Sequence, residues 1–380
     1  MLALARKELS TCSFRLFIGE KPILPQTIED LSTKATDEEL REAFVDEWGV
    51  KYSKDGRKLL EAPQELDRTY SIRKGTKVVC DRAFCLCSSL TEIVIPNSVA
   101  SIGDSAFLGC ISLTEIVIPN SVICLNGNPF IGWKGKLECL SPSFVYEDNI
   151  LFNKDKSRII SFRNQKLTLY VISNSVTSIG DSAFYDSRSL SNIVIPNSVT
   201  SIGDSAFSFC SSLKYISIPK SVICLNGNPF AEWNGKLECL SPNYIYEDDI
   251  LFNKDKSRII SFRNQNIESY VIPSSVTSIG DRAFWNCRSL SEIVIPSSVT
   301  SIGDRAFWNC RSLSEIVIPS SVTSIGECAF VLCRSLSEIV IPSSVTSIGD
   351  SAFYKCKFTD NLKQELISRF GDELFRSQLP

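Results

Sequence analysis

The feature that most constrains this chain is a repeat of 23 residues. Residues 273–295 and 296–318 are identical letter for letter, with the sequence PSSVTSIGDRAFWNCRSLSEIVI. A phenylalanine preceded by Ala or Pro marks ten copies: Phe84, Phe107, Phe130, Phe184, Phe207, Phe230, Phe284, Phe307, Phe330 and Phe353. Their steps of 23, 23 and 54 residues recur, so a unit of 100 residues is itself duplicated. A period between about 20 and 30 residues predicts a solenoid, because each coil buries its apolar side only against its neighbours.

One repeat contains the pattern of a strand that is buried on one face. Leu90, Ile93 and Ile95 follow L-x-x-I-x-I, which places Glu92 and Val94 on the opposite, outward face. A proline follows the pattern and closes the strand, because proline donates no ladder hydrogen bond.

The second half of the repeat predicts a short extended piece and a turn. Residues 99–102 are suited to the extended piece, and Gly103 permits the turn that follows. Asp104 is placed to cap a short helical turn that carries Phe107 inward. Coils stacked at strand spacing, about 4.8 Å, predict an elongated stack on the order of 60 Å long.

Two inserted segments and two terminal caps complete the predicted architecture. The segment ILFNKDKSRIISFRNQ occurs at residues 150–165 and again at 250–265, and its polar turns at 153–158 and 253–258 indicate β-hairpins. We expect the inserts to span 137–172 and 237–272, within repeats covering 76–356. An N-terminal cap over 1–75 is expected to hold a helix at 36–47 and a hairpin at 50–61, and residues 357–380 are expected to form a C-terminal capping helix.

The repeat resembles a known family. The pattern A-F-x-x-C-x-S-L-x-x-I-x-I-P-x-S-V-T-S-I-G-D is similar to the BspA-like, treponemal-type leucine-rich repeat proteins. The resemblance covers about residues 76–356 and implies a right-handed β/α superhelix with a parallel sheet. It also implies binding rather than catalysis, with adhesion to host proteins or cells in several members. Such members normally carry an export signal, and the start MLALARKELSTCSF does not show one, so the sequence favours the cytoplasm and the resemblance favours the cell surface.

Composition excludes several classes of function. The chain has no histidine, which excludes catalysis and metal binding that depend on an imidazole. Its net charge of −3 gives no basic excess for nucleic acid. No stretch reaches the ~18 apolar residues of a membrane span. We therefore expect no enzyme, no cofactor, no metal and a protein partner, either in adhesion or on an intracellular scaffold.

Cysteine is abundant, and seven of the fifteen cysteines occupy one repeat position, three residues after the phenylalanine. These are Cys87, Cys110, Cys210, Cys287, Cys310, Cys333 and Cys356. Parallel side chains in register do not reach disulfide geometry, which favours a buried column of thiols over disulfides or metal ligands. Cys85 and Cys328 lie outside this column and are expected to be exposed.

Two sets of residues are candidate contact surfaces. The first is an acidic and apolar stripe on the outward strand positions, expected on the concave sheet: Glu92, Val94, Glu115, Val117, Glu292, Val294, Glu315, Val317, Glu338 and Val340. The alternative for this stripe is a solvated position copied by duplication. The second set joins Trp285 and Trp308 to Arg282 and Arg305, a composition typical of protein interfaces. For this set the alternative is cation–π packing between coils.

Overall fold

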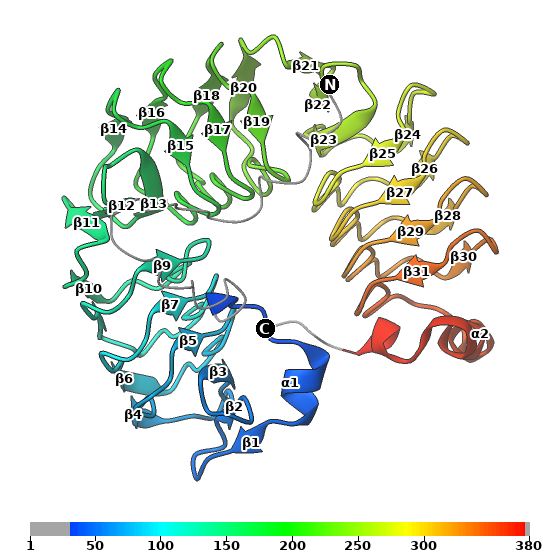
Figure 1. The fold of residues 1–380 in the computed structure, drawn as a ribbon. Coiled ribbons are helices and arrows are strands. Elements are labelled where there is room, and N and C mark those ends of the chain that lie inside the picture. Colours follow the sequence, from blue (N-terminus) through cyan, green and yellow to red (C-terminus); the bar gives the residue numbers. More distant parts are fainter. Residues whose placement is uncertain (1–30, 377–380) are drawn as a thin grey trace, which may run out of the picture.

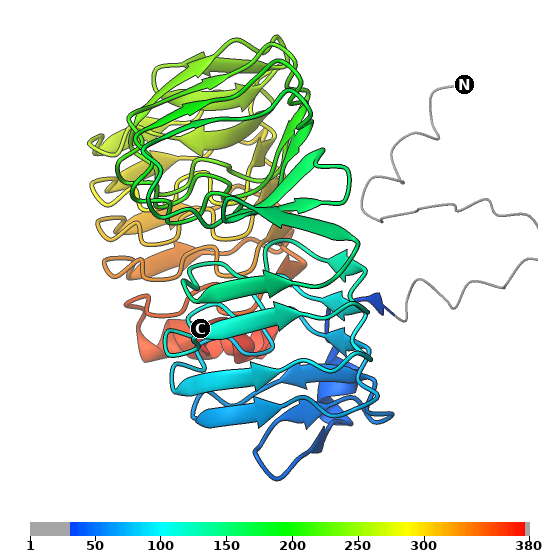
Figure 2. The same ribbon diagram turned by 90° about the vertical axis from the view of Figure 1, so that its left-hand side faces the viewer.

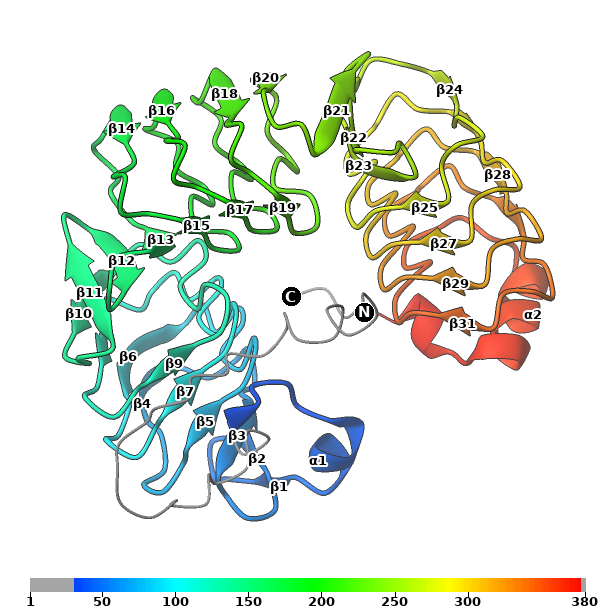
Figure 3. The same cartoon turned by 45° about the horizontal axis from the view of Figure 1, so that its top comes forward.

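The computed structural model describes residues 31–376 of the chain. The coils stack into an arc that almost closes into a ring, and its opening lies between helix α1 (Asp37–Arg41) and helix α2 (Asp360–Phe370) (Figures 1 and 3). The repeat solenoid predicted from the sequence is therefore present. It is bent into a ring, however, whereas the spacing of the strands alone had predicted an elongated stack.

The ring has three parts, which we call sectors, and each begins with an antiparallel hairpin. The inner sheet of the first sector contains β1 (Phe44–Val45), β2 (Lys51–Tyr52), β3 (Lys58–Glu61), β5 (Val78–Val79), β7 (Ser101–Ile102) and β9 (Cys124–Leu125). Its outer strands are β4 (Arg68–Ser71), β6 (Leu90–Val94), β8 (Glu115–Ile118) and β10 (Lys136–Cys139). Figure 2 shows these strands stacked in parallel.

The second sector repeats this order. Its inner sheet contains β11 (Phe144–Glu147), β12 (Ile150–Asn153), β13 (Arg158–Phe162), β15 (Ser178–Ile179), β17 (Ser201–Ile202) and β19 (Cys224–Leu225). Its outer strands are β14 (Leu169–Val171), β16 (Asn192–Val194), β18 (Tyr215–Ile218) and β20 (Lys236–Cys239).

The third sector is one coil longer. Its inner sheet contains β21 (Tyr244–Glu247), β22 (Ile250–Asn253), β23 (Arg258–Phe262), β25 (Ser278–Ile279), β27 (Ser301–Ile302), β29 (Ser324–Ile325) and β31 (Ser347–Ile348). Its outer strands are β24 (Ser269–Val271), β26 (Glu292–Val294), β28 (Glu315–Val317) and β30 (Glu338–Val340). In each sector the last hairpin strand pairs in parallel with the first inner strand, so the insert replaces one inner strand of the stack.

The two sides of the coils differ in how completely their strands pair. Inner strands form continuous sheets of six, six and seven strands, whereas outer strands form separate two-stranded pairs. Figures 1 and 3 show the inner strands that follow each hairpin nearer the centre of the ring and the outer strands on its rim, while the hairpin strands β11 and β21 reach the rim. A bent stack has a longer outer arc, so its outer strands cannot all keep the ~4.8 Å spacing of a sheet. The broken pairing is the structural consequence of the curvature.

Equivalent residues lie in register columns, as the repeat predicts. Ser278 pairs with Ser301, Ser301 with Ser324, and Ser324 with Ser347. The marker phenylalanines form buried stacks with centroid separations between 5.0 Å and 6.1 Å within the sectors. Offset aromatic stacking adds to the free energy gained by burying these rings.

The expected short helical turn is replaced by hydrogen-bonded turns with left-handed residues. The residue before each Ala-Phe pair has a positive φ, for example 54° at Ser105 and 53° at Arg282. A second left-handed residue follows the phenylalanine by two positions. Backbone N–H groups in these turns donate to carbonyls of the next coil, as Phe84 N does to the Ala106 oxygen at 2.9 Å. The coils are therefore in close contact along this line of turns.

The N-terminal cap differs from the expectation at its helix. Helix α1 spans Asp37–Arg41 and not 36–47, although Thr36 and Glu39 form the predicted capping box. Phe44 lies in β1 and stacks on Tyr52 at 5.5 Å with an interplanar angle of 12°. This tertiary contact pairs the segment with β2 and ends the helix. Residues 1–30 of the predicted cap lie outside the described residues.

At the other end, helix α2 begins after the N-cap Thr359, buries Leu366 and is followed by a 3₁₀-helix at Glu373–Phe375. Residues 377–380 of the predicted capping helix lie outside the described residues. Between residues 31 and 376, no helix combines the length and the apolar character that crossing a bilayer requires.

Candidate functional site

The acidic and apolar stripe lies on the rim of the ring. Its residues belong to the outer strands β6, β8, β26, β28 and β30, so the expected concave location is wrong (Figure 1). The reason is the direction of bending, which places the inner strands and the turns that follow them on the concave side. Val317 and Val340 are each 70% exposed, and Glu315 pairs in register with Glu338.

The concave side contains a central cavity of about 840 Å³. It is lined mainly by the turns that follow the inner strands, and its lining extends from Asp81 in the first sector to Glu327 in the third. Burial raises the pKa of the Cys328 thiol to about 11, and the charge of Arg82 in the first sector is among those that oppose this rise. Residues of the first and third sectors therefore line the same cavity.

The tryptophan and arginine cluster predicted from the sequence lines this cavity. The rings of Trp285 and Trp308 stack with centroids 4.9 Å apart and an interplanar angle of 3°. Arg282 lies 5.8 Å from the centroid of the first ring, and Arg305 lies 6.0 Å from that of the second. Both tryptophans are half-buried. Packing between coils and an accessible aromatic surface thus occur together in the same residues.

Carboxylates that the sequence did not single out complete the cluster. Arg282 forms an ion pair with Asp204, and Arg305 Nη2 lies 3.0 Å from Glu327 Oε1. Trp285 Nε1 donates to Glu232, whose other carboxylate oxygen accepts from Asn286 Nδ2. Burial raises the pKa of Glu232.

An aspartate that follows an inner strand connects neighbouring coils at six places in the described part of the chain. Asp81 Oδ1 accepts from the backbone N–H of Asp104 at 2.9 Å, and Asp104 Oδ1 accepts from that of Asn128 at 2.9 Å. The expected local helix cap is therefore a bond between coils. Burial raises the pKa of Asp104 to about 6, the nearby charges of Asp81 and Asp181 raise it further, and the Asn128 N–H opposes the rise.

The column of cysteines is free and mostly buried. Cys110 Sγ donates to the Phe84 carbonyl at 3.0 Å, and Cys310 Sγ donates to the Phe284 carbonyl at 3.1 Å. Burial raises the pKa of each thiol in the column, so the column has a packing role. Outside it, Cys85 is half-buried, whereas Cys328 is 1% exposed and contradicts the expectation of an exposed thiol.

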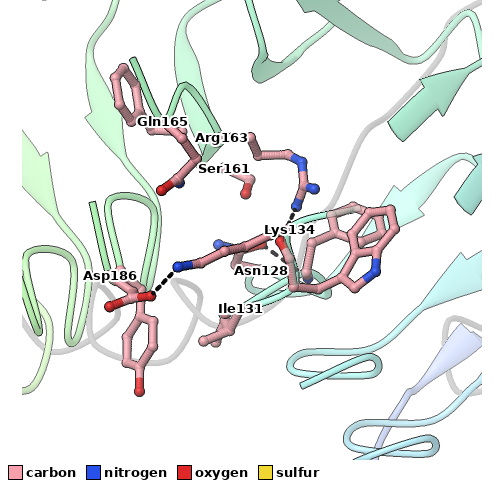
Figure 4. A pocket seen from close by; sticks show the side chains of 12 residues that line it. Asn128, Ile131, Lys134, Ser161, Arg163, Gln165 and Asp186 are labelled. Atoms are coloured by element: carbon pink, nitrogen blue, oxygen red, sulfur yellow. Dashed lines mark hydrogen bonds and ion pairs between the residues drawn. The ribbon is translucent and has the colours of Figure 1, made fainter. Parts of the chain in front are cut away.

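The junction between the first and second sectors is a packed contact. Trp133 is 4% exposed, donates to the Leu113 carbonyl at 2.7 Å, and lies under the Arg163 guanidinium at 4.4 Å. Lys134 and Asp186 form an ion pair of 3.1 Å at the same place (Figure 4). The cavity there measures about 20 Å³, room for no more than a small solvent molecule, so the junction is structural. Trp233 at the equivalent junction is equally buried.

A comparison of the two copies would have revealed the missed residues. Residues 101–200 and 201–300 are mostly identical, yet Gly132 corresponds to Glu232, Gly109 to Phe209 and Ser182 to Arg282. Within the described range, no group of three or more Cys, Asp or Glu side chains is arranged to hold a metal ion. The arrangement is suited to non-covalent recognition by rings, carboxylates and guanidinium groups.

Known structures give similar but distant matches. A leucine rich cell surface protein from Faecalibacterium prausnitzii is 25% identical with a TM-score of 0.47, and the match covers 89% of this chain and 98% of that one. A leucine-rich repeat protein from Eubacterium ventriosum is 22% identical with a TM-score of 0.40, covering 75% and 87%. The pneumococcal vaccine antigen PcpA is 18% identical with a TM-score of 0.42, covering 89% and 99%. A comparison with curated proteins finds no match.

The family comparison covers most of the repeats. The model of the BspA type leucine rich repeat region matches six copies, at residues 69–147, 158–245 and 258–379. These ranges contain most of the strands and turns of all three sectors, whereas the hairpin strands β1, β2, β3, β12 and β22 lie outside them. Proteins built from such repeats generally bind other proteins. The chain therefore belongs to the BspA type leucine rich repeat family.

Proposed function

We propose that this chain is a non-catalytic protein-binding repeat protein whose main contact surface is the central cavity. The observation that carries the proposal is the stacked pair Trp285 and Trp308, half-buried, on a cavity of about 840 Å³. Tryptophan and arginine are the side chains that most often dominate the binding energy of protein interfaces. Because the surface is concave and formed by many coils, it is suited to a protruding segment of a partner rather than to a flat surface.

The divergence of the duplicated units supports this location. Tyr185 of the first copy corresponds to Trp285, and Ser182 corresponds to Arg282, while the strands around them are nearly unchanged. A purely structural column needs no such change, since both copies have the same coil geometry, with φ of 51° at Ser182 and 53° at Arg282. The changes place aromatic and charged side chains at the cavity.

A second candidate surface is the stripe on the rim. Its favouring observation is a line of exposed apolar side chains, with Val294 at 45%, Val317 at 70% and Val340 at 70% exposure. Exposed apolar residues that recur on one face indicate an interaction surface. The separated outer pairs make this rim less continuous than the cavity lining, so we rank it second.

We further propose that the binding serves adhesion at the surface of a host-associated microbe, as the family resemblance implies. The alternative is an interaction scaffold inside the cell. Treating intact native cells with protease separates the two, because a surface protein is digested while an internal one is protected. Protection of the chain in intact cells, with digestion after lysis, would reject adhesion.

The proposed surface is tested with a partner that has been identified by capture and then purified. Trp285→Ala with Trp308→Ala is expected to weaken binding by about tenfold or more, because a hot-spot residue contributes at least about 2 kcal/mol. Glu315→Lys with Glu338→Lys on the rim serves as the matched control and is expected to leave binding unchanged. Loss of binding only in the rim variant would transfer the function to the second candidate surface.

A further inference from the structure

The central cavity contains more acidic than basic side chains. Six acidic residues line it against three arginines: Asp81, Asp104, Asp181, Asp204, Glu232 and Glu327 against Arg82, Arg282 and Arg305. Two of the arginines are already paired within the cluster, Arg282 with Asp204 and Arg305 with Glu327. Asp181 lies 4.0 Å from Arg158, which is outside the lining. The carboxyl groups of Asp81, Asp104 and Glu232 then remain against the single arginine Arg82, so the cavity attracts positively charged groups.

Glu232 holds a carboxyl group at the cavity in the left-handed position that follows the phenylalanine of each coil by two residues. Its backbone has a φ of 59°, in the left-handed region, where its counterpart Gly132 has 68°. Its hydrogen-bond donors, Trp285 Nε1 and Asn286 Nδ2, are neutral. A half-buried carboxylate with neutral partners retains the capacity to accept hydrogen bonds from a cation. Phe209 likewise stands in the left-handed region at 60°, where its counterpart is Gly109.

Aromatic rings line the same cavity beside these carboxylates. Tyr185, Phe209, Trp285 and Trp308 are all part of its lining. Carboxylates together with aromatic faces are the combination that recognises ammonium and guanidinium groups, because the ring quadrupole attracts a cation. An anionic ligand would be repelled by the same carboxylates.

An unused hydrogen-bonding group points to the same ligand. Ser208 lines the cavity and is 2% exposed, and its hydroxyl has no hydrogen-bond partner among residues 31–376. A buried hydroxyl without a partner is costly, and its oxygen can accept from a donor-rich group. Lysine and arginine side chains carry three and five donors and no acceptor. The first copy has Leu108 at this position, so the hydroxyl is specific to the second copy.

From these observations we propose that the central cavity binds a basic peptide segment of the partner, with its lysine or arginine side chains among Glu232, Ser208 and the tryptophans. This inference rests on the proposed function and specifies the chemistry of the partner. A basic peptide in an extended conformation supplies several cations at regular spacing, which suits a lining whose acidic residues recur from coil to coil.

The experiment titrates the full chain with a soluble peptide of alternating glycine and arginine, followed by calorimetry and by tryptophan fluorescence. A peptide of alternating glycine and glutamate is the matched ligand control. We expect the basic peptide to bind, with weaker binding at higher salt, and the acidic peptide not to bind. Equal binding of both peptides, or of neither, would overturn the proposal.

Variants locate the binding. Glu232→Gln keeps the size of the side chain and is expected to lower the affinity for the basic peptide by about tenfold. This is the effect expected for the loss of a charged contact at an interface. Glu115→Gln removes one carboxylate from the rim and is expected to have no effect. Equal affinity of Glu232→Gln and the unchanged chain would also overturn the proposal.

The inference and the proposed function can fail separately. If the basic peptide does not bind but Trp285→Ala with Trp308→Ala still abolishes binding of the purified partner, the cationic ligand is wrong and the cavity remains the contact surface. If the tryptophan variant leaves the partner unaffected, the proposed surface is wrong as well. Circular dichroism of each variant, compared with the unchanged chain, separates loss of binding from loss of fold.

Discussion

Residues 101–200 and 201–300 have nearly the same sequence and the same coils, yet they differ where they meet the central cavity. In the first copy the junction has Lys134 paired with Asp186 at 3.1 Å, and the adjoining cavity measures about 20 Å³. The second copy has Asn234 and Asn286 at the equivalent positions. Both copies contribute residues to the lining of the central cavity, so the difference shows that one coil geometry accommodates different side chains at the junction and at the cavity.

The contrast is sharpest at one repeated aspartate. Asp204 of the second copy forms an ion pair with Arg282. The equivalent aspartate of the first copy is Asp104, and the residue equivalent to Arg282 is Ser182, which has no charge. Burial raises the pKa of Asp104 to about 6, because its charge is compensated by hydrogen bonds alone. The same residue type therefore has different energetics in two copies of one unit.

The largest expected effect tests whether the junctions around Trp133 and Trp233 contribute equally to stability. Trp133→Ala and Trp233→Ala each remove a buried ring and its hydrogen bond to a carbonyl, at 2.7 Å and 2.6 Å respectively. We expect each to lower the free energy of unfolding by about 3–5 kcal/mol. Denaturation with urea measures this. A large loss in one copy and none in the other would show that the junctions are not equivalent.

A second prediction compares the same substitution in both copies at pH 7. Asp204→Asn leaves Arg282 without its ion-pair partner and is expected to cost about 1–2 kcal/mol. Asp104→Asn removes a carboxylate whose charge is disfavoured, so we expect a gain of about 1–2 kcal/mol. Urea denaturation of both variants measures the sign of each change in the free energy of unfolding. Equal signs would show that Arg282 does not distinguish the copies.

The pH dependence of stability tests the Asp104 assignment independently. Its pKa is about 6 when folded and 3.8 when unperturbed, so between these values the folded state binds more protons than the unfolded state. The contribution of the Asp104 carboxyl group to the free energy of unfolding is therefore highest below pH 4. It falls by about 1–2 kcal/mol as the pH rises to 6. Asp104→Asn is expected to reduce this slope. An unchanged slope in the variant would assign the effect to another group.

The smallest expected effect concerns strain at Glu232. Glu232→Gly restores the residue of the first copy at a φ of 59° and removes a carboxyl whose pKa is raised by burial. We expect the free energy of unfolding to rise by less than about 1 kcal/mol while binding at the cavity weakens. A thermal melt measures the first quantity and peptide titration the second. A clear loss of stability would mean that Glu232 has a structural role instead.

The strand pattern of the fold followed from the sequence because it is local and repeated. Leu90, Ile93 and Ile95 are buried, and Val94 between them is exposed, as alternation requires. The direction of curvature did not follow, because it depends on the difference between inner and outer spacing summed over many coils. For that reason the acidic and apolar stripe, which includes Glu315, was expected on the concave side although it lies on the rim.

The candidate site was predicted only in part. The composition of Trp285, Trp308 and the arginines indicated a contact surface, and the structure places them on one cavity. Their acidic partners come from turns of other coils, and Asp204 lies 78 positions before Arg282. No sequence pattern specifies such a contact, although the difference between Gly132 and Glu232 was available in the sequence.

The central claim is that the residues by which the second copy differs from the first create the binding surface. The most direct measurement uses a variant with the first copy's residues at three cavity positions, Glu232→Gly, Arg282→Ser and Trp285→Tyr, and determines its affinity for the purified partner by calorimetry. These residues already occur in the same coil geometry, so the fold should be kept. We predict a loss of affinity of about tenfold or more with an unchanged circular dichroism spectrum. Full affinity in this variant would contradict the claim.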